Sequence, residues 1–420
     1  MQMRKYKLGD IATVEISGVD KKIKDGEEDI RLCNFVDVYY NWAITMARHD
    51  SFMLATARPN EISKFQLKKG QVALTKDSET RDDIGISTYI ADDFNDVILG
   101  YHCALITPNK DILDGRYLNA LMHTGYAKKY FACNASGSGQ RYALSAEILN
   151  SFPVPVIPLQ KQKQIGEIFS ALDKKIELNK QINQNLEAMA KQLYDYWFVQ
   201  FDFPNEEGKP YKSSGGEMVW NEKLKRNIPV GWHCWNLFEI AVFTNGLACQ
   251  KFRPKDDEVP LPVIKIREMH DGISVDTEEV TSNIPESVKV YNGDVLFSWS
   301  ASLEVMLWAY GLGGLNQHIF KVTSANDFPK SFYYFQLLDY VDVFKKMAEA
   351  RKTTMGHITQ DHLQQSTIAI PDNKDIADKF EELISPIFKQ IVKLQEEISN
   401  FIKQRDELLP LLMNGQITIE

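Results

Sequence analysis

The sequence contains an internal repeat whose period is about half of its 420 residues. Four segments of the first half match four segments of the second half in the same order: residues 6–12 (YKLGDIA) with 235–241 (WNLFEIA), 69–74 (KGQVAL) with 292–297 (NGDVLF), 101–104 (YHCA) with 317–320 (QHIF), and 144–147 (LSAE) with 358–361 (ITQD). The offset shrinks along the chain, as a duplication followed by loop deletions would produce. We therefore expect two related globular halves.

Each half ends with a short apolar run followed by a long helical pattern. The runs at residues 154–158 (VPVIP) and 367–371 (TIAIP) are β-branched and bounded by proline, so they predict strands. The first helix should extend from about Leu159 to Phe198, which is roughly 60 Å at the usual rise per residue. A small domain does not need such a helix for its own core. We expect two spacer helices that pair in antiparallel fashion.

Heptad spacing in both helical segments is typical of a coiled coil. In the first segment, the two series are Ile165, Leu172, Asn179, Leu186 and Leu193, and Ile168, Ile182 and Met189. In the second, they are Phe380, Ile387, Leu394, Phe401 and Leu408, and Ile384, Ile391, Ile398 and Leu412. Asn179 is either a buried amide that fixes the register or a residue of an exposed or fraying turn. Pro386 should kink the second helix or delay its regular part.

These patterns predict an α+β protein in which two pseudo-repeated globular α/β domains are separated by two long helices that form an antiparallel coiled coil. The expected divisions are a first globular domain (1–157), a spacer helix (158–201), a linker (202–230), a second globular domain (231–371) and a second helix (372–415). Residues 203–216 are rich in proline, glycine and serine. We expect them to form a connecting loop and not a core element.

Composition limits the possible functions. The chain has no apolar N-terminal core like that of a signal peptide and no run near the roughly 18 apolar residues that cross a bilayer, so we expect a cytoplasmic protein. Its net charge of −9 argues against a nucleic-acid binder, because phosphate contacts usually leave a basic footprint. DNA binding would require the positive residues to gather on one face.

The sequence lacks the signatures of a self-contained enzyme. Neither a phosphate-binding loop nor the Asn-Pro-Pro-aromatic motif of amino-methyltransferases is present. The five cysteines contain no C-x-x-C pair and the eight histidines show no metal-ligand spacing, so we expect reduced, buried thiols and no metal site. The matched His102 and His318 are interpreted as hydrogen-bonded structural histidines. A Pro-Asp pair at Asp372 resembles the start of a nuclease motif, but a helix cap is the preferred interpretation.

Several motifs together resemble one known family. They are residues 160–165 (QKQKQI) after a proline-ended strand, 193–204 (LYDYWFVQFDFP), 228–232 (IPVGW) and 293–298 (GDVLFS). In this order, and over essentially its whole length, the chain resembles the specificity subunits of type I restriction-modification systems.

The resemblance implies a non-catalytic DNA-binding subunit. Its two target recognition domains would each read one half of a split, asymmetric sequence in double-stranded DNA, and its helices would act as a ruler. It would dock two methyltransferase subunits and, through them, restriction-translocase subunits. The chain itself would use no cofactor; S-adenosylmethionine, ATP and Mg²⁺ would belong to the partners, as would adenine methylation by base flipping. The methyltransferase would also supply much of the phosphate clamp.

Candidate DNA contacts come from residue types that read base edges or hold phosphates. Two loops lie directly before the matched Leu144 and Ile358, and their candidates are Ser138, Gln140 and Arg141 in the first loop and Arg351, Lys352, Thr353, Thr354 and His357 in the second. A second matched pair comprises Lys76 and Ser78, and Trp299 and Ser300. Tyr40 and Asn41 form a third candidate patch. The alternatives are solvated turns whose hydroxyls cap the next element, packing of Trp299, and a half-buried strand end at Tyr40.

Two other classes of function stay open at this stage. One is a nuclease or methyltransferase on a duplicated scaffold, which the missing motifs disfavour. The other is a coiled-coil adaptor that never touches DNA, which the acidic charge favours. Salt-sensitive, sequence-dependent DNA binding would separate the preferred interpretation from the adaptor.

Overall fold

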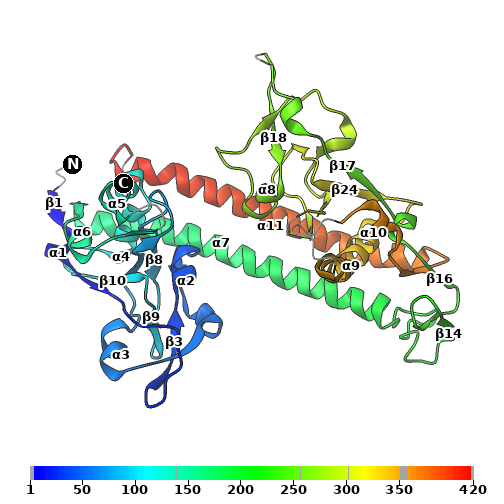
Figure 1. Cartoon of the computed structure of the whole chain (residues 1–420), viewed down its shortest axis with the longest axis horizontal. Helices are drawn as coiled ribbons and strands as arrows, with labels where there is room; N and C mark the ends of the chain where they lie inside the picture. Colours follow the sequence, from blue (N-terminus) through cyan, green and yellow to red (C-terminus); the bar gives the residue numbers. More distant parts are fainter. Residues whose placement is uncertain (1–3, 138–140, 256, 301, 351–357, 418–420) are drawn as a thin grey trace. The chain divides into compact units, whose positions relative to one another are not determined.

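The computed structural model describes residues 4–137, 141–255, 257–300, 302–350 and 358–417 (Figure 1). The chain divides into two compact units. Unit 1 comprises Met1–Glu177 and Phe401–Glu420, and unit 2 comprises Leu178–Asn400. Both units contain strands and helices, and this confirms the predicted α+β class.

Unit 1 is built around a five-stranded sheet. Its order is β2 (Ala12–Ile16), β10 (Cys103–Pro108), β6 (Val72–Thr75), β8 (Ser87–Ile90) and β4 (Ala43–Ile44). One smaller sheet has the order β5 (Met53–Ala57), β3 (Glu28–Cys33) and β9 (Val97–Leu99). Another has the order β11 (Ser136–Gly137), β12 (Tyr142–Ala143) and β7 (Asp77–Ser78). Strand β1 (Arg4–Lys7) pairs with β13 (Pro153–Val156). The short helices are α1 (Leu8–Ile11), α2 (Phe35–Tyr39), η1 (Met46–Ser51), α3 (Pro59–Phe65), α4 (Gly115–Met122), α5 (Gly125–Asn134) and α6 (Ala146–Asn150). Every residue of β6 is buried, as its central position requires.

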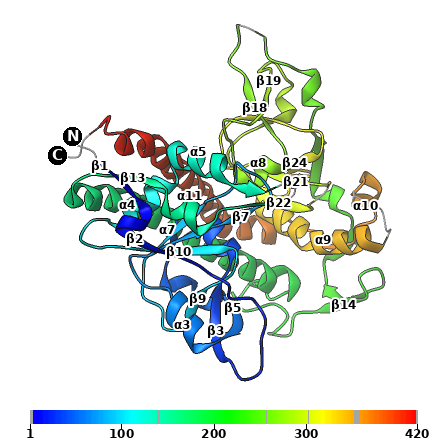
Figure 2. The ribbon, with the colours of Figure 1, turned by 60° about the vertical axis from the view of Figure 1, so that its left-hand side comes forward.

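Unit 2 has a related four-stranded sheet. Its order is β17 (Ala241–Asn245), β24 (Ile319–Ser324), β21 (Val295–Ser298) and β22 (Glu304–Leu307). A second four-stranded sheet has the order β19 (Glu279–Val280), β18 (Leu261–Ile264), β23 (Gly313–Leu315) and β20 (Lys289–Val290). Strands β14 (Met218–Asn221) and β15 (Arg226–Pro229) form a hairpin, and β16 (Trp232–Trp235) pairs with β25 (Ile368–Pro371). The short helices are η3 (Leu237–Glu239), η4 (Cys249–Lys251), α8 (Ile266–Asp271), η5 (Glu286–Val288) and α10 (Gln360–Gln364), and α9 (Lys330–Ala350) is a longer helix of 21 residues. Figure 2 shows α9 beside β22.

The internal repeat is visible in equivalent hydrogen bonds. The Leu144 amide donates to the Lys76 carbonyl at 2.8 Å, and in unit 2 the Ile358 amide donates to the Trp299 carbonyl at 2.9 Å. The strand pairs repeat too, since Tyr6 lies opposite Val154 in unit 1 as Trp235 lies opposite Ile368 in unit 2. The two predicted proline-ended strands are therefore β13 and β25, each paired with the first strand of its own half.

Two matched glycines explain why the sequence motif before β6 and β21 is repeated. Gly70 has a φ of +97° and Gly293 a φ of +86°. Residues with a Cβ rarely adopt this left-handed backbone conformation. Glycine at these positions lets the chain turn directly into the central strand of each sheet.

Both predicted long helices are present: α7 (Leu159–Tyr194), which continues in the π-helical turn η2 (Asp195–Val199), and α11 (Asp375–Met413). In unit 1, the Lys175 ammonium lies 5.1 Å from the centroid of the Phe401 ring. In unit 2, Asn179 Nδ2 donates to Glu397 Oε2 at 3.1 Å, and the rings of Tyr194 and Phe380 lie 6.2 Å apart. Partner numbers fall as α7 numbers rise, so the predicted antiparallel pairing is confirmed (Figure 1).

The buried seam of α7 differs from the predicted one. The series that contains Ile165 and Asn179 is correct, because both residues are buried. The companion series is wrong at two of its three members, since Ile182 is 36% exposed and Met189 51% exposed, whereas Ile168 packs against the core of unit 1. The buried companions lie one residue later in the heptad, at Phe169, Ile176, Asn183 and Ala190. An asparagine and an alanine carry little apolar signal, and the partner helix is what buries them.

Asn179 is buried and hydrogen-bonded, so the first of its two interpretations holds. However, it is not the lone polar residue of the seam, because Asn183 is also buried. The two series predicted for α11 are confirmed by the burial of Phe380, Ile384 and Ile391. This helix continues through Pro386 without a break.

Three local expectations are wrong. Asp372 does not cap α11; its carboxylate accepts a hydrogen bond from His233 at 2.5 Å, and Asn373 bonds the Asp375 amide instead. The linker contains a core residue, Phe203, which is 4% exposed and stacks on Trp232 with a ring distance of 5.7 Å. One of the five cysteines, Cys133, is exposed, although the other four are buried. For Asp372 and Phe203, a partner distant in sequence decides the outcome.

Candidate nucleic-acid interface

In unit 1, strand pairing brings two of the three predicted patches together. Strand β12 pairs with β7, so Tyr142 lies opposite Ser78 and Ala143 opposite Asp77. Arg141 therefore stands directly before β12, next to the strand that follows Lys76. The two patches form one surface, which we call the unit 1 cluster: Lys76, Asp77, Ser78, Arg81, His102, Arg141 and Tyr142.

Asp77 lies at the centre of this cluster. Its Oδ2 accepts from the Lys76 ammonium at 2.8 Å and contacts His102 Nδ1 at 2.5 Å. Burial alone would raise the pKa of Asp77, but the hydrogen bonds from Lys76 and His102 outweigh it and lower that pKa. Asp77 is thus an ionised acceptor that holds the two neighbouring donors in place.

Arg141 lies over the His102 ring. Its Nη2 atom is 3.0 Å from Nδ1 and 3.1 Å from Nε2 of His102. An in-plane hydrogen bond reaches only one ring nitrogen, so the guanidinium lies against the ring face. The ring supports the guanidinium while Arg141 stays exposed to solvent.

A third cation completes the cluster. The Arg81 guanidinium lies 5.1 Å from the centroid of the Tyr142 ring. Arg81 and Arg141 are thus two exposed cations on one surface of an acidic chain, whereas Lys76 is neutralised by Asp77. DNA binding by such a chain requires positive charge on one face, and these two arginines are the candidates for it.

Ser78, Tyr40 and Asn41 take more local roles. Ser78 is half-buried and its Oγ accepts from the Thr80 amide at 3.2 Å, so it stabilises a turn. Tyr40 is 75% exposed and ends helix α2, not a strand. The Asn41 side chain donates to the Asp37 carbonyl at 2.7 Å. The neighbouring Tyr39 hydroxyl bonds Asp83 at 2.7 Å, and Asp83 belongs to the loop that carries Arg81.

The equivalent surface of unit 2 is more apolar. Trp299 takes the place of Lys76; its Nε1 atom lies 3.3 Å from Asn245 Oδ1, and its ring lies 6.0 Å from that of Phe320. Ser300 is 7% exposed. Trp299 therefore packs onto the sheet, and Ser300 is covered by its surroundings.

The two matched histidines are not equivalent. His102 is hydrogen-bonded, as expected of a structural histidine, but it also takes part in the charged cluster. His318 contacts Gln317 through Nε2 at 3.3 Å, and its buried Nδ1 has no hydrogen-bond partner among the described residues. The expectation of a fully hydrogen-bonded His318 is therefore wrong.

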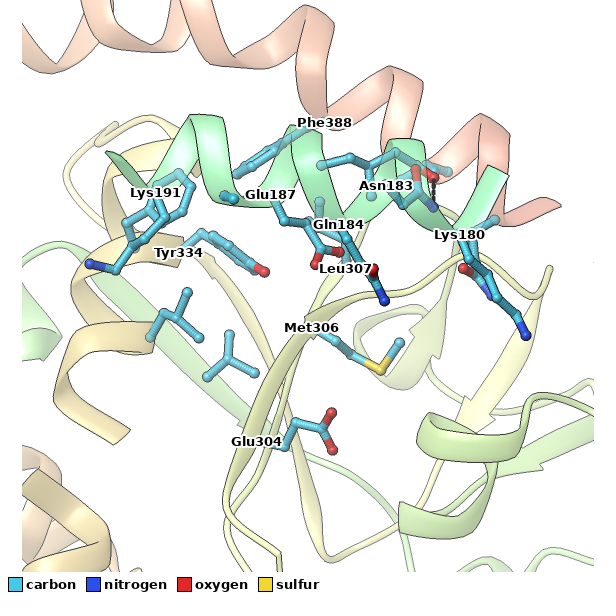
Figure 3. A pocket seen from close by; sticks show the side chains of 18 of the residues that line it. Lys180, Asn183, Gln184, Glu187, Lys191, Glu304, Met306, Leu307, Tyr334 and Phe388 are labelled. Carbon is cyan, nitrogen blue, oxygen red and sulfur yellow. Dashed lines mark hydrogen bonds between the residues drawn. The ribbon is translucent and has the colours of Figure 1, made fainter. Parts of the chain in front are cut away.

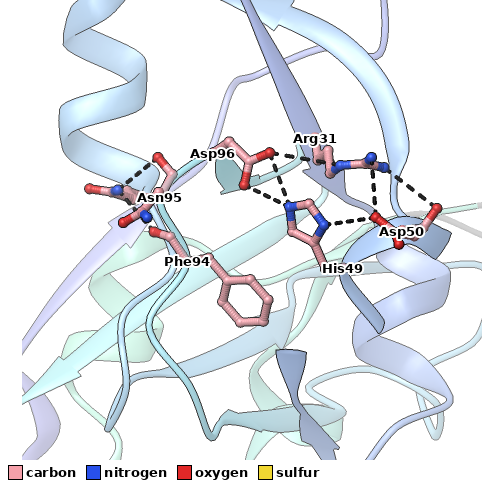
Figure 4. Close-up of polar contacts among 7 residues, drawn as sticks. Arg31, His49, Asp50, Phe94, Asn95 and Asp96 are labelled. Carbon is pink, nitrogen blue, oxygen red and sulfur yellow. Dashed lines mark hydrogen bonds and ion pairs between the residues drawn. The ribbon is translucent and has the colours of Figure 1, made fainter. Parts of the chain in front are cut away.

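A second polar network in unit 1 is self-neutralised (Figure 4). His49 lies between Asp50 and Asp96, at 2.9 Å from each carboxylate, and Arg31 lies 3.4 and 3.7 Å from the same two residues. Hydrogen bonds to Asp50 and Asp96 raise the pKa of His49. The cations of this network face carboxylates of their own unit, so it does not offer free positive charge to DNA.

Across the described residues, no group of three or more His, Cys, Asp or Glu side chains is arranged to hold a metal ion. None of the helices in the described part of the chain has the length and apolar character that a membrane span needs.

Comparison with known proteins identifies the family. Residues 2–188 and 229–406 match the type I restriction modification DNA specificity domain, once in each half. The chain belongs to this family. The two matches correspond to the two halves of the internal repeat, each with most of its long helix.

Two relatives of this specificity-subunit family align over most of the chain. The MjaIX specificity subunit of Methanocaldococcus jannaschii is 25% identical and covers 74% of this chain and 71% of its own length. The HindI specificity subunit of Haemophilus influenzae is 23% identical and covers 84% of this chain and 88% of its own length. The crystal structure of the type I restriction-modification S subunit from M. genitalium covers 98% of this chain and 96% of its own, with a TM-score of 0.58 at 12% identity. That likeness supports the fold.

Several predicted contacts of this specificity subunit lie outside the described residues: Ser138, Gln140, Arg351, Lys352, Thr353, Thr354 and His357. They stay predictions. The sequence interpretation missed Arg81 and the roles of Asp77 and His102. The repeated position of His102 and His318, directly before β10 and β24, was the one available signal for His102. No sequence signal placed Arg81 beside Tyr142, because this contact depends on the folding of the loop that carries Arg81.

Proposed function

We propose that this specificity subunit reads a bipartite, asymmetric sequence in double-stranded DNA, one half-site per unit. The observation that carries the proposal is the unit 1 cluster, in which Arg141 lies against His102 and Arg81 lies over Tyr142. Arginine can read guanine through two hydrogen bonds in the major groove, and lysine holds phosphates. The remaining acidic surface is then compatible with DNA binding.

Arg141 has the geometry of a base-reading residue. A guanidinium that rests on the His102 ring loses less conformational freedom on binding than a free side chain does. The ring in turn is held by ionised Asp77 at 2.5 Å. In this proposal Arg141 contacts the DNA, and His102 and Asp77 are positioning residues.

The two units would read different sequences. Trp299 and Ser300 stand in unit 2 where Lys76 and Asp77 stand in unit 1. Equivalent frameworks that carry different side chains favour an asymmetric target. Repeated long helices at the end of each half favour a defined spacing between the two half-sites.

The proposal assigns catalysis to partner subunits. A methyltransferase would use S-adenosylmethionine, and a restriction translocase would use ATP and Mg²⁺, while this chain would supply recognition and docking without a cofactor of its own. Family membership supports this division.

Selection of bound sequences from random duplex DNA at about 0.15 M salt tests the proposal, with the chain alone and with its methyltransferase partner. We expect two short half-sites roughly one helical turn apart. A flat profile in both arms would overturn the proposal and favour the adaptor that never touches DNA. The acidic net charge is the observation behind that second candidate.

A further inference from the structure

The repeated sheets of the two units differ at one edge. In unit 1, β4 is the fifth strand and runs parallel to β8, with Ala43 opposite Tyr89. The Tyr89 amide donates to the Trp42 carbonyl at 3.0 Å and the Ala91 amide to the Ile44 carbonyl at 2.8 Å. In unit 2, among the described strands, β22 ends the corresponding sheet.

Strand register shows that β22 corresponds to β8. Tyr89 lies opposite Val72 in unit 1, and Leu307 lies opposite Val295 in unit 2. The Trp308 amide donates inward to the Asp294 carbonyl at 2.9 Å. Because alternate amides of a strand point to opposite sides, the Leu307 and Ala309 amides face outward. They are the counterparts of the Tyr89 and Ala91 amides.

In unit 1, the side chain next to β4 fills the space between the sheet and the helices. Trp42 stacks on His123 with a ring distance of 4.3 Å and lies 5.8 Å from Phe169 of α7. The Arg405 guanidinium lies 4.9 Å from the Trp42 ring centroid, and Asn119 donates to the Trp42 carbonyl at 3.1 Å. One tryptophan thus joins β4 to helix α4, α7 and α11.

Unit 2 has a pocket of about 610 Å³ at the corresponding place (Figure 3). Strand β22 forms one wall, and α7, α9 and α11 supply the others. Helices α4 and α9 align because Gly115 packs against the Gly70 carbonyl and Lys330 donates to the Gly293 carbonyl at 2.7 Å. In this alignment Tyr334 and Leu338, which line the pocket, take the places of Asn119 and His123.

Four charged side chains line the pocket: Glu187, Glu304, Lys180 and Lys191. Glu304 lies 3.2 Å from His270, and Lys191 pairs with Asp195 and, at 2.9 Å, with Asp339. Partial burial raises the pKa of Glu187. Asn183 is 7% exposed, and its Oδ1 has no hydrogen-bond partner among the described residues. A donor from a ligand would satisfy it.

We propose that the outer edge of β22 binds an extended segment of a partner protein in parallel, with an aromatic side chain of tryptophan size in the pocket and basic residues beside it. The outward amides of Leu307 and Ala309 supply the backbone pairing, as in strand addition to a sheet edge. Unit 1 shows the same arrangement within one chain, and Glu187 and the Asn183 Oδ1 atom supply acceptors for the basic flanks. This proposal does not rest on DNA reading by either unit.

The probe is a fluorescent peptide of residues 40–45 (YNWAIT) with a lysine at each end, titrated against the full chain by anisotropy. We expect saturable binding with a dissociation constant on the order of 10 µM, which corresponds to a modest short-peptide interaction. Replacement of the peptide's tryptophan by alanine should weaken binding at least about tenfold. Glutamate in place of the two lysines should also weaken it.

A variant of the chain locates the site. Ala188 lines the pocket from α7, so Ala188→Trp should fill it and abolish peptide binding. Met189→Trp changes the next residue, which is 51% exposed and is not part of the lining, and should leave binding intact. Equal thermal midpoints of the two variants would exclude misfolding. Absence of peptide binding, equal binding of the alanine peptide, or equal binding by Ala188→Trp would overturn the proposal.

Discussion

At the residue scale, the cluster around Asp77 concentrates cations in an acidic chain. The Arg141 guanidinium is held against His102 by contacts of 3.0 and 3.1 Å, so its direction is set before DNA arrives. Preorganisation of this kind favours specificity because fewer conformations are lost on binding. Neighbouring Arg81 is arranged over Tyr142 in the same way. These contacts make Arg141 the sharpest test of recognition by unit 1.

Arg141→Ala should weaken binding of the selected DNA by about 1–3 kcal/mol and relax one base position of one half-site. Competition binding with single-base variants of the target measures both effects. Lys64→Ala is the control, because Lys64 is an exposed cation that pairs with Glu15 and lies outside the cluster. Wild-type affinity and specificity in Arg141→Ala would remove this loop from the interface.

His233 should make the stability of unit 2 depend on pH. Its imidazole lies 2.5 Å from Asp372 and 3.0 Å from Glu239. Burial lowers the pKa of His233, but the hydrogen bonds to the two carboxylates outweigh burial and raise it above its ordinary value of about 6.5. The added stability is therefore complete below about pH 6.5 and is lost as pH rises through the folded-state pKa.

The difference in urea midpoint between wild type and His233→Gln should accordingly shrink between pH 5.5 and 8.5. Asp372→Asn, which removes one carboxylate and keeps the histidine, should show a smaller pH dependence than wild type. A midpoint difference that is constant over this range would contradict the assignment.

At the element scale, the seam between α7 and α11 carries two buried amides with different surroundings. Asn179 donates to Glu397 Oε2 at 3.1 Å, whereas Asn183 donates to the Ile391 carbonyl at 3.3 Å and its Oδ1 has no partner among the described residues. A buried acceptor without a partner carries a desolvation cost that an apolar side chain does not. The two amides should therefore respond differently to the same substitution.

Asn183→Leu should raise the free energy of unfolding by about 1 kcal/mol, while Asn179→Leu should lower it because Glu397 loses its donor. Urea denaturation compares the two variants at the same helix seam. Buried amides also specify register, so Asn183→Leu should admit other pairings of the helices, which native mass spectrometry would detect as oligomers. Equal destabilisation by both variants would show that Asn183 is satisfied in solution.

At the scale of the whole molecule, the ruler hypothesis makes a prediction about DNA spacing. Insertion of about four residues, one helical turn, in both α7 and α11 should lengthen the unread gap of the target and leave each half-site unchanged. Sequence selection with the inserted chain measures the gap. The control is an insertion of equal length in the loop at residues 203–216, which should preserve the spacing. An unchanged spacing between the half-sites in the helix variant would contradict the ruler hypothesis.

Features that depend on short-range periodicity could be predicted from the sequence. The proline-ended strands β13 and β25 and both seams of α11 follow from side-chain patterns that repeat every two or about 3.5 residues. The first series of α7, with Ile165 and Asn179, follows in the same way. These patterns predicted the fold class and the two long helices, because they depend on near neighbours along the chain. The antiparallel pairing was predicted from the presence of two such helices on one chain. The duplication follows from segments that match at about half the chain length.

Tertiary structure decided what depends on residues far apart in sequence. The partner helix buries Asn183 and Ala190, although neither is strongly apolar. Pairing of β7 with β12 brings Arg141 to Asp77 and His102, and the different sheet edges of the two units are a property of strand order. By itself, the sequence determined a duplicated, helix-linked chain. The fold decided which cations meet and which strand edge stays open, because both result from long-range packing.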